Sequence, residues 1–552
     1  MRRMRLYAIL IAMVTFVACN DEDFDSILTT DLETETFIFS AEGGKQTFVL
    51  ESNDKWFVSE LPEWLNVEVK DFEEISARSV SYTKGKKEVT VIVKTNPDYE
   101  ERSSEAILST INGTILKLTI TQEKKTKLLT DLESNELNFS YRGGQHSFLL
   151  ESNEEWTIND IPSWLSVSVI DVEEVDVRST SYESGEKEIT ITAEVNSQFE
   201  TRSAEITLTS LKNQTIILEV VQEKKPELVG YWILSEGYAG SDNSEIAWFD
   251  NATGILTKKH FKTINGTTLG DTGNALKIYG SKMYAVISGS GFGANTPHGT
   301  SYIEVIDPKN GKSIKRIQFT NTGGDAAKPR NIIFEGGFGY ITSYSNELVR
   351  LDTLTLEFDS RAALSGKLAE GLAYSNGYIY VCNSGQGEDN KISVVNTETM
   401  EETKIITSPM NPTGIVATSS GEIYFNTNYP EYKLYKLTED DNYEELQGLS
   451  VADMIYTNNN IYTSSFDWGT YMGEVNQFNT TTHTHTKLGL DLKSVGIDML
   501  MEYHIGTINE SDDLYLSGMG QDVIIFDPAT LEIKHAFQTG VANGSGVVAV
   551  YK

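Results

Sequence analysis

The stretch Tyr279-Gly280-Ser281-Lys282-Met283-Tyr284 decides the fold, because it places a small-residue turn just before a tyrosine in a hydrophobic segment. A turn of this kind between apolar segments is typical of a tight β-hairpin that needs positive φ angles. An aromatic residue in such a segment occurs seven times over residues 228–552. These residues are Trp232, Tyr284, Tyr340, Tyr380, Tyr424, Tyr462 and Tyr515, at successive spacings of 52, 56, 40, 44, 38 and 53 residues.

Short strands repeated at such spacings are typical of the blades of a β-propeller. In most repeats a further strand follows the aromatic one and stops at Asp or Asn, as in Tyr302 to Asp307, although the fifth repeat stops at Thr438. Each repeat is therefore interpreted as four strands, A to D, with the aromatic residue on strand B. The first repeat starts at strand B, and a spare A-like strand, Gly546 to Tyr551, ends the chain. Pairing the two would close seven blades over residues 228–552 without unpaired edges.

The amino terminus has the features of a secretion signal. Three arginines within the first five residues precede a 13-residue apolar run, Leu6 to Ala18, which is too short to span a bilayer of about 30 Å as a helix. Residues 1–18 are therefore predicted to be a signal peptide. The segment Phe16-Val17-Ala18-Cys19 resembles the lipobox of bacterial lipoproteins, which implies acylation of Cys19; ordinary secretion is the alternative.

The residues behind Cys19 are acidic. The segment Asn20 to Asp25 looks like the export signal that sends lipoproteins of Bacteroidota to the outer leaflet, so residues 19–30 are predicted to be an acidic tether. This implies a lipid-anchored protein on the cell surface, at the outer membrane. A solvated linker is the alternative reading.

A tandem duplication with a period of 100 residues lies between the tether and the propeller. The pairs Trp56/Trp156, Asn96/Asn196, Arg102/Arg202 and Gln122/Gln222 fall in register. Alternating apolar and polar residues, as in Val89 to Val93, predict strands, and seven or eight per unit suggest an immunoglobulin-like sandwich. The sequence therefore predicts two such sandwiches, over residues 31–125 and 131–225, in an all-β chain.

These two units resemble the BACON domain, whose name records a proposed carbohydrate-binding role. The motifs that carry the resemblance are Glu-Ser-Asn-x-x-Trp (Glu51 to Trp56, Glu151 to Trp156), Pro-x-Trp-Leu (Pro62 to Leu65, Pro162 to Leu165), Asn96 to Arg102, Asn196 to Arg202, Gln122-Glu123 and Gln222-Glu223. Trp56 and Trp64 are interpreted as core residues rather than sugar platforms. The pair of sandwiches is then a spacer between membrane and propeller.

The composition argues against a nucleic-acid partner. The formal net charge is −35, which repels phosphate backbones and anionic lipid surfaces. Cys382 is the only cysteine besides Cys19, so we expect no intramolecular disulfide in the mature chain and an inert core thiol at Cys382.

The propeller resembles the YncE-like surface lipoproteins, including the BtuG-type proteins that capture cobalamin. The resemblance rests on Gly230 to Gly237, Leu269 to Gly273, Tyr279 to Tyr284 and Lys328 to Arg330. It implies a non-enzymatic protein that captures a nutrient, cobalamin or a related corrinoid, and passes it to an outer-membrane transporter. A surface glycan-binding protein of a polysaccharide-utilisation system is the alternative, and a propeller lyase or hydrolase is a more distant one.

The loops on one face of a propeller supply the candidate ligand contacts. The B–C loops and the connections between blades meet on that face, and aromatic and amide side chains there suit a large polar ligand with flat faces. The predicted contacts are Tyr238, Phe292, Arg330, Tyr344, Asn383, Asn411, Tyr429, Phe466 and Trp468. The same loops also hold Asp271, His298, Asn428 and Asp467. For any one of these residues, simple loop packing is the alternative.

Catalytic and metal motifs find little support. His483 and His485 lie at a two-residue spacing on an expected outer strand, and no nearby Cys or carboxylate completes a metal ligand set. The run Gly289 to Gly293 lacks the following helix that a nucleotide site needs. We therefore expect no enzyme activity, no cofactor and no metal.

Overall fold

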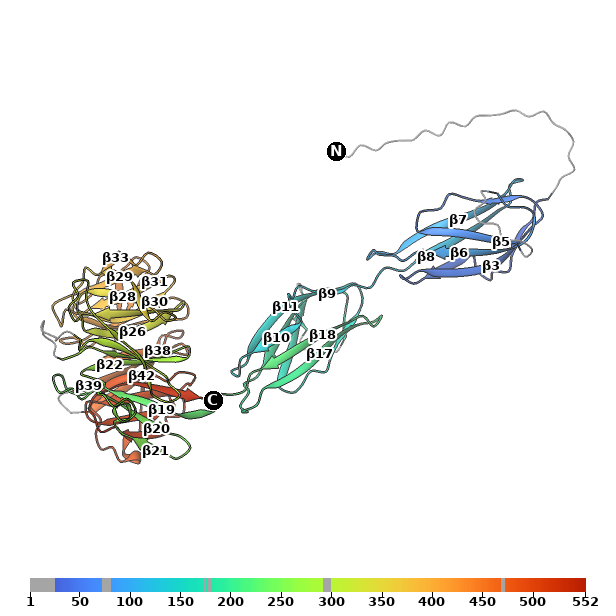
Figure 1. Cartoon of the computed structure of the whole chain (residues 1–552). Coiled ribbons are helices and arrows are strands. Elements are labelled where there is room, and N and C mark those ends of the chain that lie inside the picture. Colours follow the sequence, from blue (N-terminus) through green and yellow to red (C-terminus); the bar gives the residue numbers. More distant parts are fainter. Residues whose placement is uncertain (1–24, 72–80, 172–174, 177–180, 291–298, 468–471) are drawn as a thin grey trace. The chain divides into compact units, whose positions relative to one another are not determined.

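The structure, a computed structural model, describes residues 25–71, 81–171, 175–176, 181–290, 299–467 and 472–552 (Figure 1). The predicted signal peptide and Cys19 lie outside these residues. The chain divides into two compact units, Met1–Lys225 and Pro226–Lys552. None of the helices among the described residues is long and apolar enough to cross a membrane.

The first unit contains two β-sandwiches of the same topology. In the first sandwich one sheet has the order β1-β3-β6-β5 and the other β2-β8-β7-β4; the second sandwich has β9-β11-β16-β13-β14 and β10-β18-β17-β12-β15. The strands of the first are β1 Leu28–Thr30, β2 Thr36–Phe39, β3 Gly44–Ser52, β4 Trp56–Val58, β5 Leu65–Asp71, β6 Gly85–Val93, β7 Arg102–Thr110 and β8 Ile115–Gln122. Those of the second are β9 Leu128–Thr130, β10 Glu136–Phe139, β11 Gly144–Ser152, β12 Trp156–Asn159, β13 Leu165–Asp171, β14 Val175–Asp176, β15 Ser181–Tyr182, β16 Gly185–Ala193, β17 Arg202–Ser210 and β18 Thr215–Gln222.

The paired tryptophans are structural. Trp56 and Trp156 are 0% and 1% exposed and lie in the cores of the first and second sandwich. Trp64 and Trp164 are partly buried, and the guanidinium groups of Arg102 and Arg202 cover their rings at 4.6 Å and 4.5 Å. The interpretation of Trp56 as a core residue is therefore confirmed, and one face of Trp64 is already occupied.

The second unit is a seven-bladed propeller, as predicted, with a four-stranded sheet in each blade. Blade 1 contains β46 Gly544–Tyr551, β19 Leu228–Ser235, β20 Glu245–Asp250 and β21 Ile255–Thr257. Blade 2 contains β22 Gly273–Tyr279, β23 Lys282–Ile287, β24 Tyr302–Ile306 and β25 Ser313–Gln318. Blade 3 contains β26 Pro329–Glu335, β27 Phe338–Ser343, β28 Glu347–Asp352 and β29 Glu357–Ala363. Blade 4 contains β30 Ala369–Ser375, β31 Tyr378–Asn383, β32 Lys391–Asn396 and β33 Glu401–Thr407. Blade 5 contains β34 Pro412–Ala417, β35 Ile423–Thr427, β36 Leu434–Leu437 and β37 Tyr443–Leu446. Blade 6 contains β38 Asp453–Thr457, β39 Asn460–Asp467, β40 Met472–Asn479 and β41 Thr484–Leu488. Blade 7 contains β42 Glu502–Thr507, β43 Leu514–Gly518, β44 Asp522–Phe526 and β45 Ile533–Gln538. Two short helices, α1 His260–Asn265 and the 3-10 helix η1 Leu492–Val495, lie in connections between blades.

The last strand closes the ring. β46 pairs antiparallel with β19, and Trp232 lies opposite Val548. In Figure 1 the red strand that ends at the carboxy terminus lies in the propeller beside β19. This confirms the prediction that the carboxy-terminal strand completes the first blade. The aromatic anchors pack between blades: Tyr284 is 0% exposed, and its ring centre lies 4.8 Å from that of Phe334 in the next blade.

Candidate ligand site in the central channel

The innermost strands of all seven blades line a cavity of about 370 Å³ at the centre of the propeller. Each of these A strands begins on the face that carries the B–C loops, because it pairs antiparallel with strand B of its blade. The residues at the beginning of the A strands therefore form the mouth of the channel on that face. The adjacent A strands approach closely: a Cβ at Gly371 would lie 2.5 Å from the carbonyl oxygen of Thr413.

Arg330 is the centre of the mouth. It is the second residue of β26, and its Nε donates to Glu370 Oε2, the second residue of β30, at 3.1 Å. Its Nη1 donates to Asn274 Oδ1 on β22 at 2.7 Å. Three blades are thus joined by one guanidinium, which orients two polar side chains at the rim of the channel.

Two tyrosines extend this network. The hydroxyl of Tyr344 donates to Glu370 Oε1, and the ring centre of Tyr344 lies 4.8 Å from the guanidinium carbon of Arg330. On the other side, the hydroxyl of Tyr503 on β42 donates to Glu236 Oε2, directly after β19. We use the name mouth cluster for Asn274, Arg330, Glu370, Tyr344, Tyr503 and Glu236.

The electrostatics of the mouth cluster are set by burial. Burial raises the pKa of Glu236, and the hydrogen bond from Tyr503 and the charge of Arg330 only partly offset it. Burial acts to lower the pKa of Arg330, but the surrounding acidic groups, Glu370 first, outweigh it and raise that pKa. The guanidinium therefore stays charged, and the cluster carries no excess of positive charge to attract an anion.

The structure brings two of the predicted contacts, Arg330 and Tyr344, together in the mouth cluster. Asn383 has no exposed surface, and its amide donates to Ser393 Oγ at 2.9 Å, so it supports its loop instead of facing the channel. Asn411 is 8% exposed, and its amide donates to the carbonyl of Tyr429 at 2.8 Å. Asn411 thus holds the loop that carries Tyr429.

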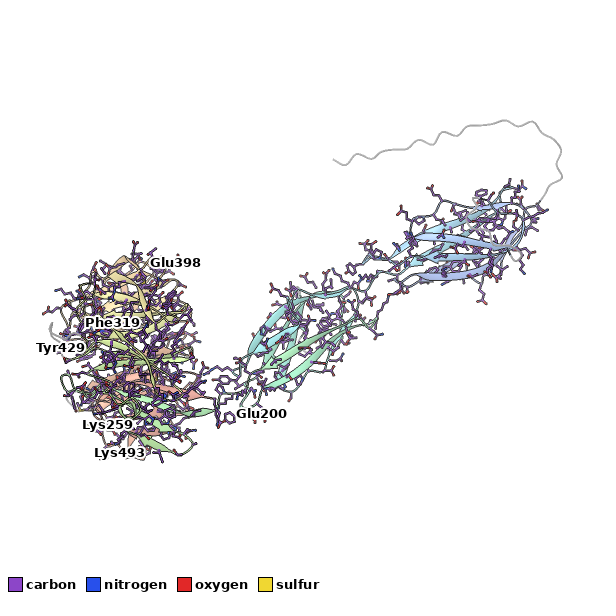
Figure 2. The ribbon with its side chains drawn as sticks, in the orientation of Figure 1. Glu200, Lys259, Phe319, Glu398, Tyr429 and Lys493 are labelled. Atoms are coloured by element: carbon purple, nitrogen blue, oxygen red, sulfur yellow. The ribbon has the colours of Figure 1, made fainter. Side chains whose placement is uncertain are left out.

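Two other predicted contacts project from the loops around the mouth. Tyr238 is 60% exposed and Tyr429 is 71% exposed, and Figure 2 shows Tyr429 at the outer surface of the propeller. Along the sequence, Tyr238 stands two residues after Glu236 of the mouth cluster, and Tyr429 directly follows Asn428, which lines the cavity. Phe466 is half-buried in β39, whereas Phe292 and Trp468 lie outside the described residues.

Apart from Arg330, the polar residues on the A strands themselves were not among the predicted contacts. Asn274, Glu370 and Tyr503 in the mouth cluster, and Lys277, Asp453 and His504 deeper in the channel, all come from A strands. For Asn274 and Glu370 a signal exists in the sequence: a polar residue stands directly before a small residue and an aliphatic one, as in Asn274-Ala275-Leu276 and Glu370-Gly371-Leu372. Each of these is the second residue of its A strand and therefore lies at the mouth.

Two other features of the propeller have less to offer a ligand. A hollow of about 610 Å³ lies between blades 4 and 5, but its lysines are already paired, Lys404 with Asp441 at 2.8 Å and Lys436 with Glu422 at 2.5 Å. His483 and His485 are exposed near the outer strand β41, as expected of a solvated surface. Among the described residues, no group of three or more His, Cys, Asp or Glu side chains could hold a metal ion.

The propeller region matches a known sequence family. The sequence profile of a family described as "Domain of unknown function (DUF5074)" matches residues 229–543, more than half of the chain. The chain belongs to the DUF5074 family. The described channel is thus the centre of a DUF5074 propeller. A second profile, "BACON: Putative binding domain, N-terminal", matches residues 154–223, which form most of the second sandwich. No curated protein matches the chain.

Solved structures resemble the chain only loosely. Kuenenia stuttgartiensis hydrazine synthase is 14% identical over 49% of this chain and 81% of its own, with a TM-score of 0.38. The WD40 repeats of RRP9 are 8% identical over 50% and 83%, with a TM-score of 0.40. The computationally designed Ika8 protein is 10% identical over 51% and 95%, with a TM-score of 0.36. Likenesses at this level carry no argument about function.

Proposed function

We propose that this DUF5074 protein is a non-catalytic surface lipoprotein whose propeller captures a corrinoid such as cobalamin at the mouth of its channel, for delivery to an outer-membrane transporter. The mouth cluster carries the proposal. It presents guanidinium, carboxylate, amide and phenol groups from several blades around one opening. The rim of a corrinoid is covered with amide groups, which accept from such donors and donate to such acceptors.

The dimensions support a ligand that lies across the mouth. The cavity of about 370 Å³ suits a small ligand or one part of a large one. A whole corrinoid is too large to enter it. Its flat macrocycle would rest on the loops, where Tyr238 and Tyr429 offer exposed rings.

Arg330 provides the test. In isothermal titration calorimetry of the full-length protein with cyanocobalamin, we expect Arg330→Gln to weaken binding roughly tenfold or more, because a charged donor at the mouth is lost. Arg350→Gln is the matched control: Arg350 pairs with Asp359 at 2.7 Å and covers the Phe338 ring at 4.5 Å, but it lies outside the lining of the channel. Equal effects of the two substitutions, or no heat with any corrinoid, would contradict the proposal.

Glycan capture is the second candidate. It is supported by the match of the second sandwich to a putative binding domain and by the exposed rings of Tyr238 and Tyr429, which could stack on sugar faces. A glycan array with the same proteins separates the two ligands. A reproducible glycan signal that Arg330→Gln removes, together with no corrinoid heat, would favour this candidate.

The lipid anchor is tested at Cys19. We expect Cys19→Ala to abolish acylation and to move the protein out of the membrane fraction, because one acylated cysteine is the proposed attachment. Cell fractionation and metabolic labelling with a palmitate analogue measure both effects. Cys382→Ala is the control, because Cys382 is 0% exposed inside the propeller. A membrane-bound Cys19→Ala protein would rule out this anchor.

A further inference from the structure

One position of the A strands is charged in a single blade only. In every blade, one residue of the A strand lies directly opposite the aromatic anchor of strand B. These residues are Lys277, Ile333, Ala373, Val416, Ile455, Gly506 and Val548, for blades 2 to 7 and then blade 1. Six of the seven are apolar or glycine, so the fold does not require a lysine at this position.

The ammonium group of Lys277 has no direct partner in the part of the chain that the structure describes. Lys277 lines the cavity and is partly buried, and within the described part of the chain its Nζ makes no hydrogen bond or ion pair. Burial lowers the pKa of Lys277, and the only charge that opposes this effect is that of Asp453 on β38. A desolvated cation without a partner is costly, so such a residue is expected only where something else compensates for it.

Two further polar side chains of the channel lining, a carboxylate and an imidazole, stand on the neighbouring A strands β38 and β42. His504 Nδ1 donates to Asp453 Oδ2, which also accepts from the backbone N–H of Ile505 at 3.0 Å. Asp453 Oδ1 and His504 Nε2 have no partner among the described residues. Asp453 and His504 stand two residues before Ile455 and Gly506 on their strands, so they lie on the same strand face, one step closer to the mouth than Lys277.

We propose that Lys277, Asp453 and His504 form a second binding site, deeper in the channel, for one uncharged group that both accepts and donates hydrogen bonds: a primary carboxamide. Its oxygen accepts from Lys277 Nζ, and its N–H₂ donates to Asp453 Oδ1. In this respect the inference rests on the proposed function, because the carboxamide belongs to the ligand held at the mouth. We call these three residues the deep site.

The charges favour a neutral group over an ion. Lys277 and Asp453 carry opposite charges, so an added carboxylate or ammonium would leave one charge uncompensated in a partly desolvated channel. An anion would also have to pass Glu236 and Glu370 at the mouth. A carboxamide instead satisfies a donor and an acceptor at once without changing the net charge.

Three small probes of equal length test the deep site without a corrinoid: propionamide, propionate and propylammonium. Saturation-transfer NMR on the full-length protein measures the affinity of each. We expect propionamide to bind at least about tenfold more tightly than either ion, and Lys277→Met to weaken it by a similar factor. Met is apolar like the residues of the other blades, so the variant should fold. Lys493→Met, at an exposed position of the helix η1, is the control (Figure 2).

The outcomes separate the two proposals. The deep site would be overturned if propionate bound as tightly as propionamide. It would also be overturned if the Lys277→Met variant bound propionamide as tightly as the parent protein. If cyanocobalamin binds and propionamide does not, the deep site falls and the proposed function stands. If propionamide binds through Lys277 and no corrinoid binds, the deep site stands and the proposed ligand is wrong.

Discussion

The two sandwiches repeat the same residues at the same structural positions, whereas the seven blades share an aromatic anchor and differ where they line the channel. Trp56 and Trp156 are both buried, and Arg102 and Arg202 both donate from Nε to the glutamine on the adjacent strand, at 2.9 Å and 2.8 Å. In the propeller, the lining residue three positions before the one opposite the aromatic anchor is different in every blade: Ser545, Asn274, Arg330, Glu370, Thr413, Ala452 and Tyr503. Identity between copies therefore marks the scaffold, and difference between copies marks the place where a ligand can be recognised.

The largest expected effect comes from breaking the scaffold of one sandwich. Trp156→Ala should lower the stability of the second sandwich by about 3 to 5 kcal/mol, because it leaves a large cavity in the core. Differential scanning calorimetry of the full-length protein should show this loss in one transition, with the propeller transition unchanged. Ligand binding by the propeller should also be unchanged; a weaker affinity would mean that the sandwiches are more than a spacer.

Trp164→Ala sharpens the same comparison. Trp164 is only partly buried, under the guanidinium of Arg202, so its removal should cost less than that of Trp156. An equal or larger loss would show that the cation–π contact, and not the buried ring, dominates the stability of the sandwich.

The same contrast explains what the sequence could predict. The repeat of 100 residues and the regular tyrosines identify both architectures, because every copy needs the same buried rings and turns, and the closing strand follows from the unpaired ends. The site was harder to predict. Arg330 and Tyr344 were found through their loops, but their partner Glu370 begins a strand, and its role depends on the register between blades. Lys277 becomes conspicuous only when the pairing of strands A and B aligns the seven blades.

A substitution at Glu502 tests whether a residue found in only one blade lowers the stability of the propeller. Glu502 begins β42 and is 7% exposed, and its Oε2 has no hydrogen-bond partner among the described residues; burial raises its pKa from 4.5 to about 7. The folded state therefore binds more protons between these pH values, and its stability falls as the pH rises through them. Glu502→Gln should stabilise the propeller by about 1 to 3 kcal/mol at pH 8 and hardly at all at pH 4.

Urea unfolding as a function of pH measures this difference. Glu398→Gln is the control, because Glu398 is exposed at the surface of blade 4 (Figure 2). Equal stability of Glu502→Gln and the parent protein at pH 8 would mean that the carboxylate is compensated in solution, for example by water.

The smallest expected effect concerns Lys277 and has the opposite dependence on pH. Because burial lowers the pKa of Lys277 below 10.5, the unfolded state binds more protons between the two values, and stability rises with pH through that window. Lys277→Met should therefore stabilise the propeller by about 1 kcal/mol at pH 7, and the gain should vanish as the pH approaches 10.5. Thermal unfolding at several pH values, with Lys493→Met as the control, measures this change in stability.

If the Lys277→Met variant gains stability but no longer binds propionamide, this blade keeps its lysine for the ligand, at the expense of the stability of the fold. A variant that loses stability instead would make Lys277 part of the scaffold, and the difference between blades at this position would no longer point to a ligand.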